Sequence, residues 1–280
     1  MSEISLQQLQ TWVGKTQTAA DVIAPAPARK LHAALDSDLP MPETGAALPL
    51  LWHWLYFHQH TPTAELSADG HAKRGGFLPP VPLPGRMWAG GRLRFFHPLC
   101  IGDEVNLESK ITAVRHKQGR SGALVFVTVT HRYVCGGRCA LEEECDLVYR
   151  NPAAAPKPAS APAAASPQWH RTRRPGPVLL FRYSALTFNS HRIHYDRGYC
   201  AAEGYPGLVV HGPLIATLLM HDFTHRAPRQ TVRHCTYRAL RPAFDGAPLE
   251  TAGRVANGRG ELWAVGEGGG VVMEMGLGLG

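Results

Sequence analysis

A run of apolar residues with helical spacing marks the C-terminal third of the chain. The run consists of Leu214, Ile215, Leu218, Leu219 and Phe223. Intervals of three and four residues place these side chains on adjoining faces of a helix. Gly212 and Pro213 precede the run, and Pro is favoured at a first helical position. The pattern predicts a buried helix that begins at this Gly-Pro pair.

Two earlier segments have helical patterns of their own. Residues 4–24 are weakly amphipathic, and we expect a helix there that ends before Pro25 and Pro27. Residues 47–59, ALPLLWHWLYFHQ, are apolar on most sides, which is typical of a buried helix. The N-terminal half is therefore expected to have a buried helix of its own.

Strand patterns fill the region between residues 91 and 149. The predicted strands cover residues 91–96, 105–114, 123–133 and 140–149. Turn residues at 117–122 and 135–138 separate neighbours, as antiparallel hairpins require. Before these strands, residues 61–91 are rich in Pro and Gly and are expected to form a long loop. A loop of this length in a compact domain is usually functional or mobile.

The chain divides into two halves at an Ala/Pro-rich segment. Residues 151–168 are almost entirely Ala, Pro and Ser, which predicts a stiff, solvated linker between residues 1–150 and 169–280. A short sequence similarity between the halves supports an internal repeat, because Arg, Pro and Gly recur at identical offsets in residues 94–102 and 238–246. Each half is therefore expected to contain one helix and one antiparallel sheet.

Composition and charge narrow the class of protein. With 280 residues, 44% hydrophobic and 18% charged, the chain can bury a substantial core. No apolar run approaches the ~18–20 residues of a membrane span, and the N-terminus has no basic or apolar leader, so we expect a cytoplasmic protein. The net charge of +7 is scattered and accompanies no nucleic-acid motif, so it suits an anionic small molecule better. Six cysteines without a C-x-x-C pair predict reduced, mostly buried thiols and no metal site.

Two polar clusters flank the start of the predicted C-terminal helix. Residues 189–196 read NSHRIHYD, and residues 211–213 read HGP. A helix start directs unpaired N–H groups outward, where they can receive an anionic or polarised oxygen. A histidine able to transfer a proton beside such a donor is the minimum requirement for addition or elimination next to a carbonyl.

This segment resembles the active-site motif of hotdog-fold enoyl-CoA hydratases of the MaoC-like superfamily. That motif is Asp-x-Asn-Pro-(Ile/Leu)-His, followed by a helix that opens with His-Gly. His194 matches its histidine, His211 and Gly212 match the helix opening, and Asn189 stands where the family has aspartate. The sequences TFNSHRIHYD and RMWAGG are more similar to the branch of mesaconyl-CoA and itaconyl-CoA hydratases and mitochondrial-type 3-hydroxyacyl dehydratases. The resemblance implies an α+β double hotdog, in which two repeats of an antiparallel sheet each wrap a long central helix.

The resemblance also assigns the acid/base residues. It implies that His194 deprotonates water and protonates the α-carbon, because an imidazole titrates near neutral pH. An amide cannot accept a proton, so Asn189 would orient the water. Two hypotheses remain for Asp196. It replaces the missing carboxylate, or it serves as a helix cap behind the site, and we favour the cap.

Three further residues are assigned to substrate binding. Gly212 would donate its backbone N–H to the thioester oxygen, where one such donor can contribute ~3–4 kcal/mol in the transition state. His211 would shape the same pocket or serve as a core histidine. Arg192 would bind a distal carboxylate of the acyl group, or instead a CoA phosphate or solvent.

The sequence therefore predicts an acyl-CoA hydratase/dehydratase that needs no metal or redox cofactor. The preferred substrate is a branched dicarboxylyl-CoA of the mesaconyl, 3-methylfumaryl or itaconyl type. A 3-hydroxyacyl-thioester dehydratase of fatty-acid metabolism, a hotdog thioesterase and a non-catalytic CoA- or lipid-binding protein are the alternatives. We expect a cytoplasmic homodimer in which the C-terminal repeat, 169–280, carries the chemistry and the repeat 1–150 does not. No nucleic-acid or membrane partner is expected.

Overall fold

The computed structural model describes residues 5–119, 122–151 and 166–280. In these residues the strands form one ten-stranded antiparallel sheet of order β1-β3-β4-β5-β2-β7-β10-β9-β8-β6. The first half supplies β1 (Thr16–Val22), β2 (Gly85–Phe95), β3 (Glu104–Gly119), β4 (Gly122–Cys135) and β5 (Arg138–Arg150). The second half supplies β6 (Trp169–Arg173), β7 (Val232–Ala239), β8 (Leu249–Ala256), β9 (Arg259–Val265) and β10 (Val271–Leu279). The four strands predicted between residues 91 and 149 are confirmed as β2 to β5.

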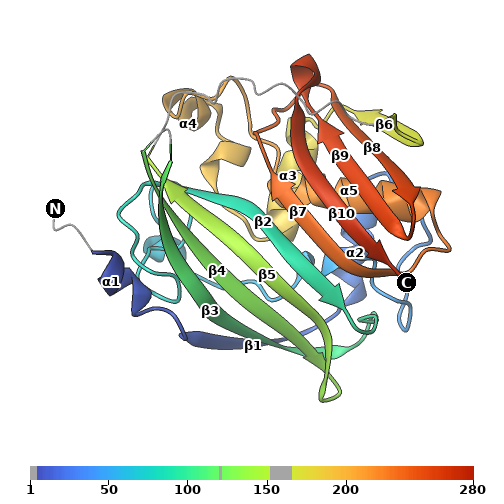
Figure 1. The fold of residues 1–280 in the computed structure, drawn as a ribbon, viewed down its shortest axis with the longest axis horizontal. Helices are drawn as coiled ribbons and strands as arrows, with labels where there is room; N and C mark the ends of the chain where they lie inside the picture. The colour runs from blue at the N-terminus through green and yellow to red at the C-terminus, as the bar shows by residue number, and fades with distance from the viewer. Residues whose placement is uncertain (1–4, 120–121, 152–165) are drawn as a thin grey trace.

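The strand order repeats across the middle of the sheet. The halves read β1-β3-β4-β5-β2 and, in mirror order, β6-β8-β9-β10-β7, and they join where β2 pairs with β7. Figure 1 shows the green strands of the first half and the red strands of the second half as one continuous sheet. The similar segments 94–102 and 238–246 begin at the ends of β2 and β7, so they occupy corresponding positions in the two repeats. The linker predicted over 151–168 falls, except for its ends, outside the described residues.

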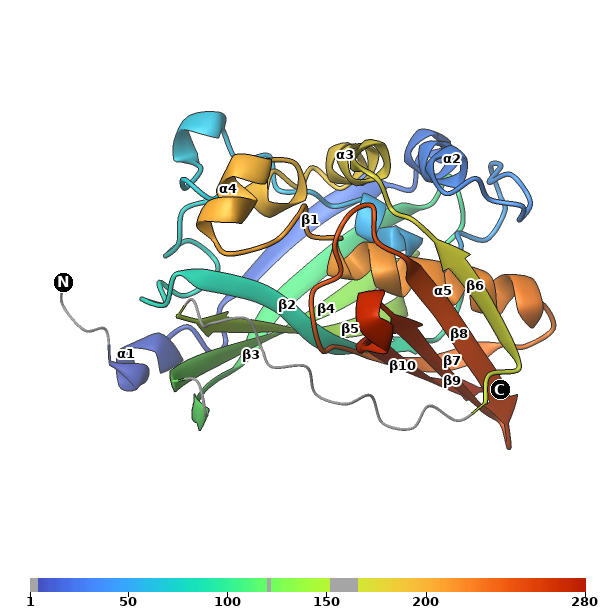
Figure 2. The same cartoon turned by 90° about the horizontal axis from the view of Figure 1, so that it is seen from above.

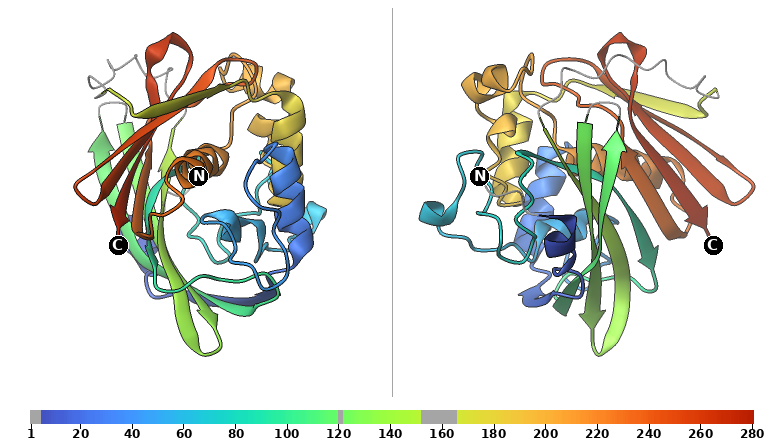
Figure 3. Two further views of the ribbon diagram at one scale, coloured as in Figure 1. Left: turned by 90° about the vertical axis from the view of Figure 1, so that its right-hand side faces the viewer. Right: turned by 60° about the vertical axis from the view of Figure 1, so that its left-hand side comes forward.

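The long helix α5 (Gly212–Arg226) is the centre of the second half. It begins at the predicted glycine, and every residue from Leu214 to Phe223 is buried. The helix packs against β8, β9 and β10, and the sheet curves around it (Figure 3). Because its apolar side chains cover all sides, α5 is enclosed between the sheet and an outer layer. Seen from above, α2 (Pro25–Ala34) and α3 (Pro177–Leu186) lie in that outer layer, with α4 (Arg197–Ala202) beside them (Figure 2).

The helix predicted over residues 4–24 is wrong. The segment forms α1 (Leu6–Gln10) and strand β1, whose register places Thr16 opposite Lys110 and Val22 opposite Glu104. The two prolines expected to end a helix instead lie in the first turn of α2, which begins at Pro25. A proline is tolerated there because the first N–H groups of a helix have no intrahelical acceptor.

The buried helix predicted over residues 47–59 is also wrong, since only one 3₁₀ turn, η1 (Trp52–Leu55), forms there. Leu51, before this turn, has φ of 70°, which is outside helical geometry. The polar atoms of the segment explain the short turn. His53 Nε2 and Trp54 Nε1 both hydrogen-bond the carboxylate of Glu143, which is buried in β5. A long central helix is therefore present in the second half and not in the first.

The other elements are short. They are the 3₁₀ turns η2 (Thr63–Glu65), η3 (Arg192–His194) and η4 (Glu267–Gly269). The long loop predicted over residues 61–91 is present from η2 until β2 begins at Gly85. All six cysteines lie in described residues and are free, although only Cys200 and Cys235 are buried. No helix in the described ranges has the length and apolar character to cross a membrane.

Candidate active site

The segment that carries His194 is fixed by local hydrogen bonds. The Asn189 side-chain oxygen accepts from the His191 N–H at 3.0 Å, which closes a turn. The turn leads into η3, which ends at His194. Val209 N then donates to Ile193 O at 2.8 Å, and this ties the segment to the strand-like residues that precede α5. The polar cluster and the helix start are thus brought together as predicted.

The environment of His194 determines which ring nitrogen carries the proton. Its Nδ1 lies 2.7 Å from the carbonyl oxygen of Val209, which can only accept. Nδ1 is therefore the donor, and Nε2 of the neutral ring has a free lone pair. Burial lowers the pKa of His194 to about 4, although the hydrogen bond to Val209 raises it in part. The ring is therefore a neutral base at physiological pH.

The start of α5 lies against this imidazole. His211 precedes the helix, and its ring stacks on His194 with centroids 3.6 Å apart and an interplanar angle of 17°. Nε2 of His211 hydrogen-bonds Ser184 Oγ at 2.8 Å, while its buried Nδ1 has no partner in the described part of the chain. Burial lowers the pKa of His211 well below its ordinary value. Both histidine rings are therefore held neutral beside the first N–H groups of α5.

Gly212 is required by a close contact with the first half of the chain. A Cβ at this position would lie 2.7 Å from Cε3 of Trp88 on β2, so any side chain would collide with the indole ring. The Trp88 ring in turn stacks on Tyr237 of β7, with centroids 4.3 Å apart. The absence of a side chain lets the helix start approach Trp88, and the first-turn N–H groups have no acceptor within the helix.

Asp196 and Arg192 form a pair outside the histidine cluster. Asp196 Oδ1 accepts from the Tyr199 N–H at 2.9 Å and caps α4, while its Oδ2 accepts from Nη2 of Arg192 at 2.7 Å. The capping role favoured for Asp196 is therefore the one the structure shows. Arg192 also donates to Ala68 O at 3.2 Å, and its guanidinium lies 4.6 Å from the centroid of the Tyr199 ring. These contacts pair the charge of Arg192 with Asp196 and leave further N–H donors of the guanidinium, so the substrate-carboxylate role stays a prediction for Arg192.

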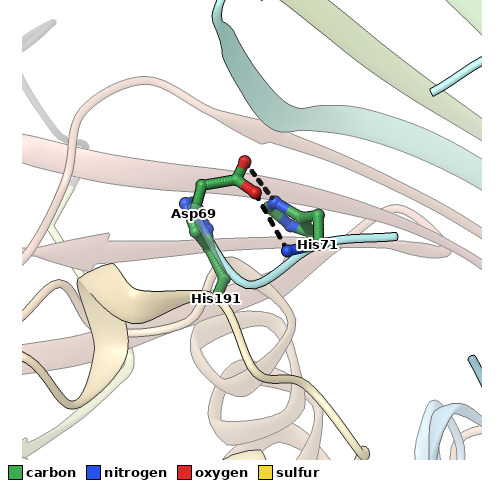
Figure 4. Close-up of side chains that lie close together, drawn as sticks. All are labelled: Asp69, His71 and His191. Atoms are coloured by element: carbon green, nitrogen blue, oxygen red, sulfur yellow. Dashed lines mark hydrogen bonds and ion pairs between the residues drawn. The ribbon is translucent and has the colours of Figure 1, made fainter. Parts of the chain in front are cut away.

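Two residues that the sequence analysis did not identify complete the cluster. Asp69 and His71, from the long loop of the first half, lie beside His191 (Figure 4). Asp69 accepts from His71 N at 3.0 Å and from Nδ1 at 2.9 Å, and the rings of His71 and His191 are 4.1 Å apart between centroids. His191 meets His194 edge to face at 5.6 Å. The nearest carboxylate side chain in this chain of rings is therefore two imidazoles away from His194.

Burial and hydrogen bonding determine the protonation states of the residues in this cluster. Burial and the neighbouring His71 and His194 lower the pKa of His191 to about 2. Burial also lowers the pKa of His71, although its hydrogen bond to Asp69 opposes this. Burial alone would raise the pKa of Asp69, but the hydrogen bonds from His71 outweigh it and keep the pKa below its ordinary value. At neutral pH the cluster thus consists of neutral rings and one carboxylate.

The loop that carries Asp69 is fastened to the active-site segment by backbone contacts. Arg192 N donates to Asp69 O at 2.9 Å, and Ser190 Oγ donates to Gly70 O at 2.6 Å. Gly70 has φ of +92°, and a Cβ there would lie 1.8 Å from Ser190 O. Only glycine fits this place. The signal that could have identified the loop was its length, which already indicated a functional segment.

The carboxylate and the two imidazoles offer ligand atoms that all lie within 4.8 Å of one another. Oxygen and imidazole nitrogen ligands at such spacing could hold a divalent cation. In this structure both Asp69 oxygens accept hydrogen bonds from His71, so the carboxylate has hydrogen-bond partners even without a cation. A hollow of about 780 Å³ lies elsewhere, lined by residues of β2, β7 and β10 that include Arg92, Arg238 and Glu274, and by none of the histidines.

The fold and the site define a class of protein, namely a two-repeat hotdog protein with a buried histidine at the start of its central helix. A protein of Mycobacterium tuberculosis described as having a double hotdog fold superimposes with a TM-score of 0.57 at 14% identity, over 95% of this chain and 96% of the other. A MaoC-like dehydratase from Phytophthora capsici superimposes with a TM-score of 0.72 at 13% identity, over 99% and 98% of the two chains. These likenesses confirm the predicted double hotdog.

Sequence comparison gives the family. The family described as hydroxyacyl-thioester dehydratase type 2 matches residues 51–245. The mesaconyl-C(4)-CoA hydratase of Chloroflexus aurantiacus is 46% identical over 96% of this chain and 97% of its own length. The chain therefore belongs to the hydroxyacyl-thioester dehydratase type 2 family, and the predicted MaoC-like branch is confirmed.

Proposed function

We propose that the protein adds water reversibly to the double bond of an α,β-unsaturated acyl-CoA, with a branched dicarboxylyl-CoA of the mesaconyl type as substrate. The observation that carries the proposal is the arrangement of His194. Its Nδ1 is fixed on Val209 O at 2.7 Å, and its ring stacks on the residue that precedes Gly212. A fixed neutral base thus lies beside a helix start that can hold a thioester oxygen. The 46% identity to a mesaconyl-C(4)-CoA hydratase supports the choice of substrate.

The reaction needs one proton removed and one returned. Nε2 of His194 accepts a proton from water as the water oxygen bonds to the β-carbon, and the π electrons of the double bond move onto the thioester oxygen. The Gly212 N–H stabilises that oxygen as negative charge develops. Nε2 then returns the proton to the α-carbon. The net change is the addition of one water molecule.

The remaining residues position the reactants. The Asn189 oxygen is engaged by His191 N, so its amide NH₂ is the group left to orient the attacking water. The nitrogen Nδ1 of His211 is buried and has no hydrogen-bond partner among the described residues, and we assign His211 to shaping the substrate pocket beside Gly212. We assign the chemistry to the C-terminal repeat, 169–280, while the repeat 1–150 supplies Trp88 and the loop with Asp69 and His71.

An absorbance assay tests the proposal. Mesaconyl-C4-CoA, itaconyl-CoA, crotonyl-CoA and a medium-chain enoyl-CoA are mixed with the enzyme, while enoyl-thioester absorbance and free thiol are followed in the same samples. Loss of absorbance without thiol release is expected, fastest for mesaconyl-C4-CoA. Thiol release would identify a thioesterase, and tight binding without turnover would identify a binding protein. Greatest activity on the medium-chain substrate would favour the dehydratase of fatty-acid metabolism, the second candidate, which the family match supports.

The proposal extends to cofactor, assembly and location. The reaction is expected to need no metal or redox cofactor, so prolonged dialysis against a chelator should leave the activity unchanged. Loss of activity that Zn²⁺ or another divalent ion restores would instead assign Asp69, His71 and His191 as ligands. We also propose a homodimer in the cytoplasm, which light scattering and cell fractionation would test.

A further inference from the structure

Arg86 lies at the active site without an acidic partner. It is a half-buried residue of β2, and it forms no ion pair with a carboxylate among the described residues. The other arginines nearby are occupied. Arg192 is held by Asp196 and Ala68 O, and Arg74 donates to the carbonyl oxygens of Val81 and Leu83. Among these three arginines, Arg86 is therefore the one whose guanidinium is available to bind an anion.

The strand register directs Arg86 toward the histidine cluster. Arg86 and Trp88 are two residues apart, opposite Tyr149 and Leu147, and the strand has no bulge between them. Alternate residues of a strand face the same side and are separated by about 7 Å. Since the Trp88 ring covers Gly212, the Arg86 side chain leaves the same face of the sheet next to the helix start. Its charge reaches the rings of His71 and His191, whose pKa it helps burial to lower.

A buried hydroxyl group lies beside Arg86. The Tyr149 hydroxyl is completely buried and has no hydrogen-bond partner of normal geometry in the described part of the chain. Arg86 lies directly opposite Tyr149 in the register of β2 and β5, so the two side chains leave the same face of the sheet as neighbours. Burial raises the pKa of Tyr149, and the Arg86 charge opposes this. A cation and an unsatisfied hydroxyl side by side form a receptor for a carboxylate, which accepts hydrogen bonds from both.

We propose that Arg86, assisted by the Tyr149 hydroxyl, binds the second carboxylate of a dicarboxylyl-CoA substrate. The inference rests on the proposed function and specifies its substrate class. With the thioester oxygen at Gly212, a short acyl group that runs across Trp88 brings its far end to Arg86. The substrate carboxylate would neutralise the Arg86 charge, which the neighbouring neutral imidazoles cannot balance and which Asp69, engaged by His71, does not pair with. Arg86 would then bind the distal carboxylate, which is one of the three alternatives considered for Arg192 above.

Substitution of Arg86 tests the inference. For Arg86→Met, kcat/KM with mesaconyl-C4-CoA is expected to fall about 100-fold, because a charge-assisted paired contact is lost. The activity with crotonyl-CoA, or with the methyl ester of mesaconyl-C4-CoA, should change less than about threefold. Arg86→Lys should lie between the wild type and Arg86→Met for mesaconyl-C4-CoA. Arg115→Met, which removes an exposed arginine of β3, is the matched control and should change neither activity.

A binding measurement makes the test independent of turnover. Succinyl-CoA and butyryl-CoA both have four-carbon acyl groups, and only succinyl-CoA has a terminal carboxylate. Calorimetry should show tighter binding of succinyl-CoA by the wild type and equal binding of the two by Arg86→Met. An equal loss of affinity for both ligands would overturn the inference and place a CoA phosphate on Arg86. If the affinity for both ligands falls equally but the wild type still hydrates mesaconyl-C4-CoA, the proposed function stands and only the role of Arg86 is contradicted. If the wild type binds succinyl-CoA selectively but hydrates no enoyl-CoA, the proposed function is contradicted and the role of Arg86 stands.

Discussion

The protonation state of a buried imidazole follows from what its two nitrogens contact. For His194 the contact is the Val209 carbonyl, which accepts from Nδ1 and leaves Nε2 as the base. His211, stacked on it, is also neutral, so a proton taken up by His194 meets no second cation in the stack. Much of this could be predicted at the residue scale, because the histidine and the Gly-Pro helix start are only 18 residues apart. Asp69 and His71 could not, because they are about 120 residues away in sequence from the segment they contact.

Gly212→Ala tests the contact between the helix start and Trp88. A methyl group 2.7 Å from an indole carbon forces one of the two elements to move, so the free energy of unfolding should fall by about 1–3 kcal/mol. The thioester-binding N–H would shift with the helix, and kcat should fall with it. Urea unfolding and steady-state kinetics measure the two effects.

A double substitution provides the control for this contact. Trp88→Leu removes the ring that the new methyl group would strike, so Gly212→Ala should cost less stability in that background than in the wild type. Additive losses in the double variant would show that the collision with Trp88 is not the reason for glycine at this position.

At the scale of elements, the active-site segment depends on a loop from the other half of the chain. The loop is joined to it through Asp69 O and Gly70 O, and the approach is possible because Gly70 has no side chain. Asp69 and His71 reach His191 only in this docked arrangement. Docking of the loop is therefore expected to affect both local stability and turnover.

Gly70→Ala should displace this loop. A Cβ would overlap Ser190 O, and alanine is strained at φ of +92°, so we expect a loss of roughly 1–3 kcal/mol and a reduced kcat. Gly14→Ala is the matched control, because Gly14 has φ of +93° with no heavy atom within 4 Å of the new Cβ. Thermal unfolding and kinetics of both variants separate backbone strain from the collision. Equal effects in the two variants would contradict the proposed role of docking.

The elements themselves were predicted unevenly, for physical reasons. The strands β2 to β5 were predictable because alternating and β-branched residues report the two faces of a strand directly. The α5 helix was predictable because its apolar spacing and its Gly-Pro start agree. The 47–59 segment was not, because His53 and Trp54 have buried polar atoms that must reach Glu143, and that partner lies in β5. Tertiary hydrogen bonds therefore overrode a local helical pattern there.

At the scale of the whole molecule, the two halves share one sheet and one polar network. Glu143 of β5 accepts from the Tyr237 hydroxyl of β7 at 3.2 Å and from Trp54, so the buried carboxylate joins both halves. Strand β2 contributes both the pairing with β7 and the Trp88 ring against α5. The two repeats are therefore expected to unfold as a single unit.

Four neutral histidines in the site predict a characteristic response to acid. The pKa values of His71, His191, His194 and His211 are all lowered by burial, to about 2 for His191 and about 4 for His194. An unfolded histidine titrates near 6.5, so below that pH the unfolded chain takes up protons that the folded chain does not. Stability is therefore fully present above pH 6.5 and declines as the pH falls toward 4.

The expected decline is a few kcal/mol per pH unit between pH 6.5 and 5, since each such group contributes up to ~1.4 kcal/mol per unit. The lowered pKa values of Asp69 and Asp222 add to it only below about pH 4, when unfolded carboxylates become protonated. Urea unfolding at pH 7 and pH 5 measures the slope, and His191→Asn should reduce it by about one proton. A free energy of unfolding that does not change over this range would contradict the neutral histidine cluster.

His194 is expected to transfer the proton in the hydration of an acyl-CoA, and His194→Gln removes this proton transfer while it keeps the fold. The amide retains a hydrogen-bonding group and about the same size but cannot accept a proton. With mesaconyl-C4-CoA we expect that the variant folds, binds the substrate with little change in affinity, and loses about 10²–10⁴-fold in kcat. A folded His194→Gln variant that hydrates mesaconyl-C4-CoA at the wild-type rate would show that His194 is not the acid/base.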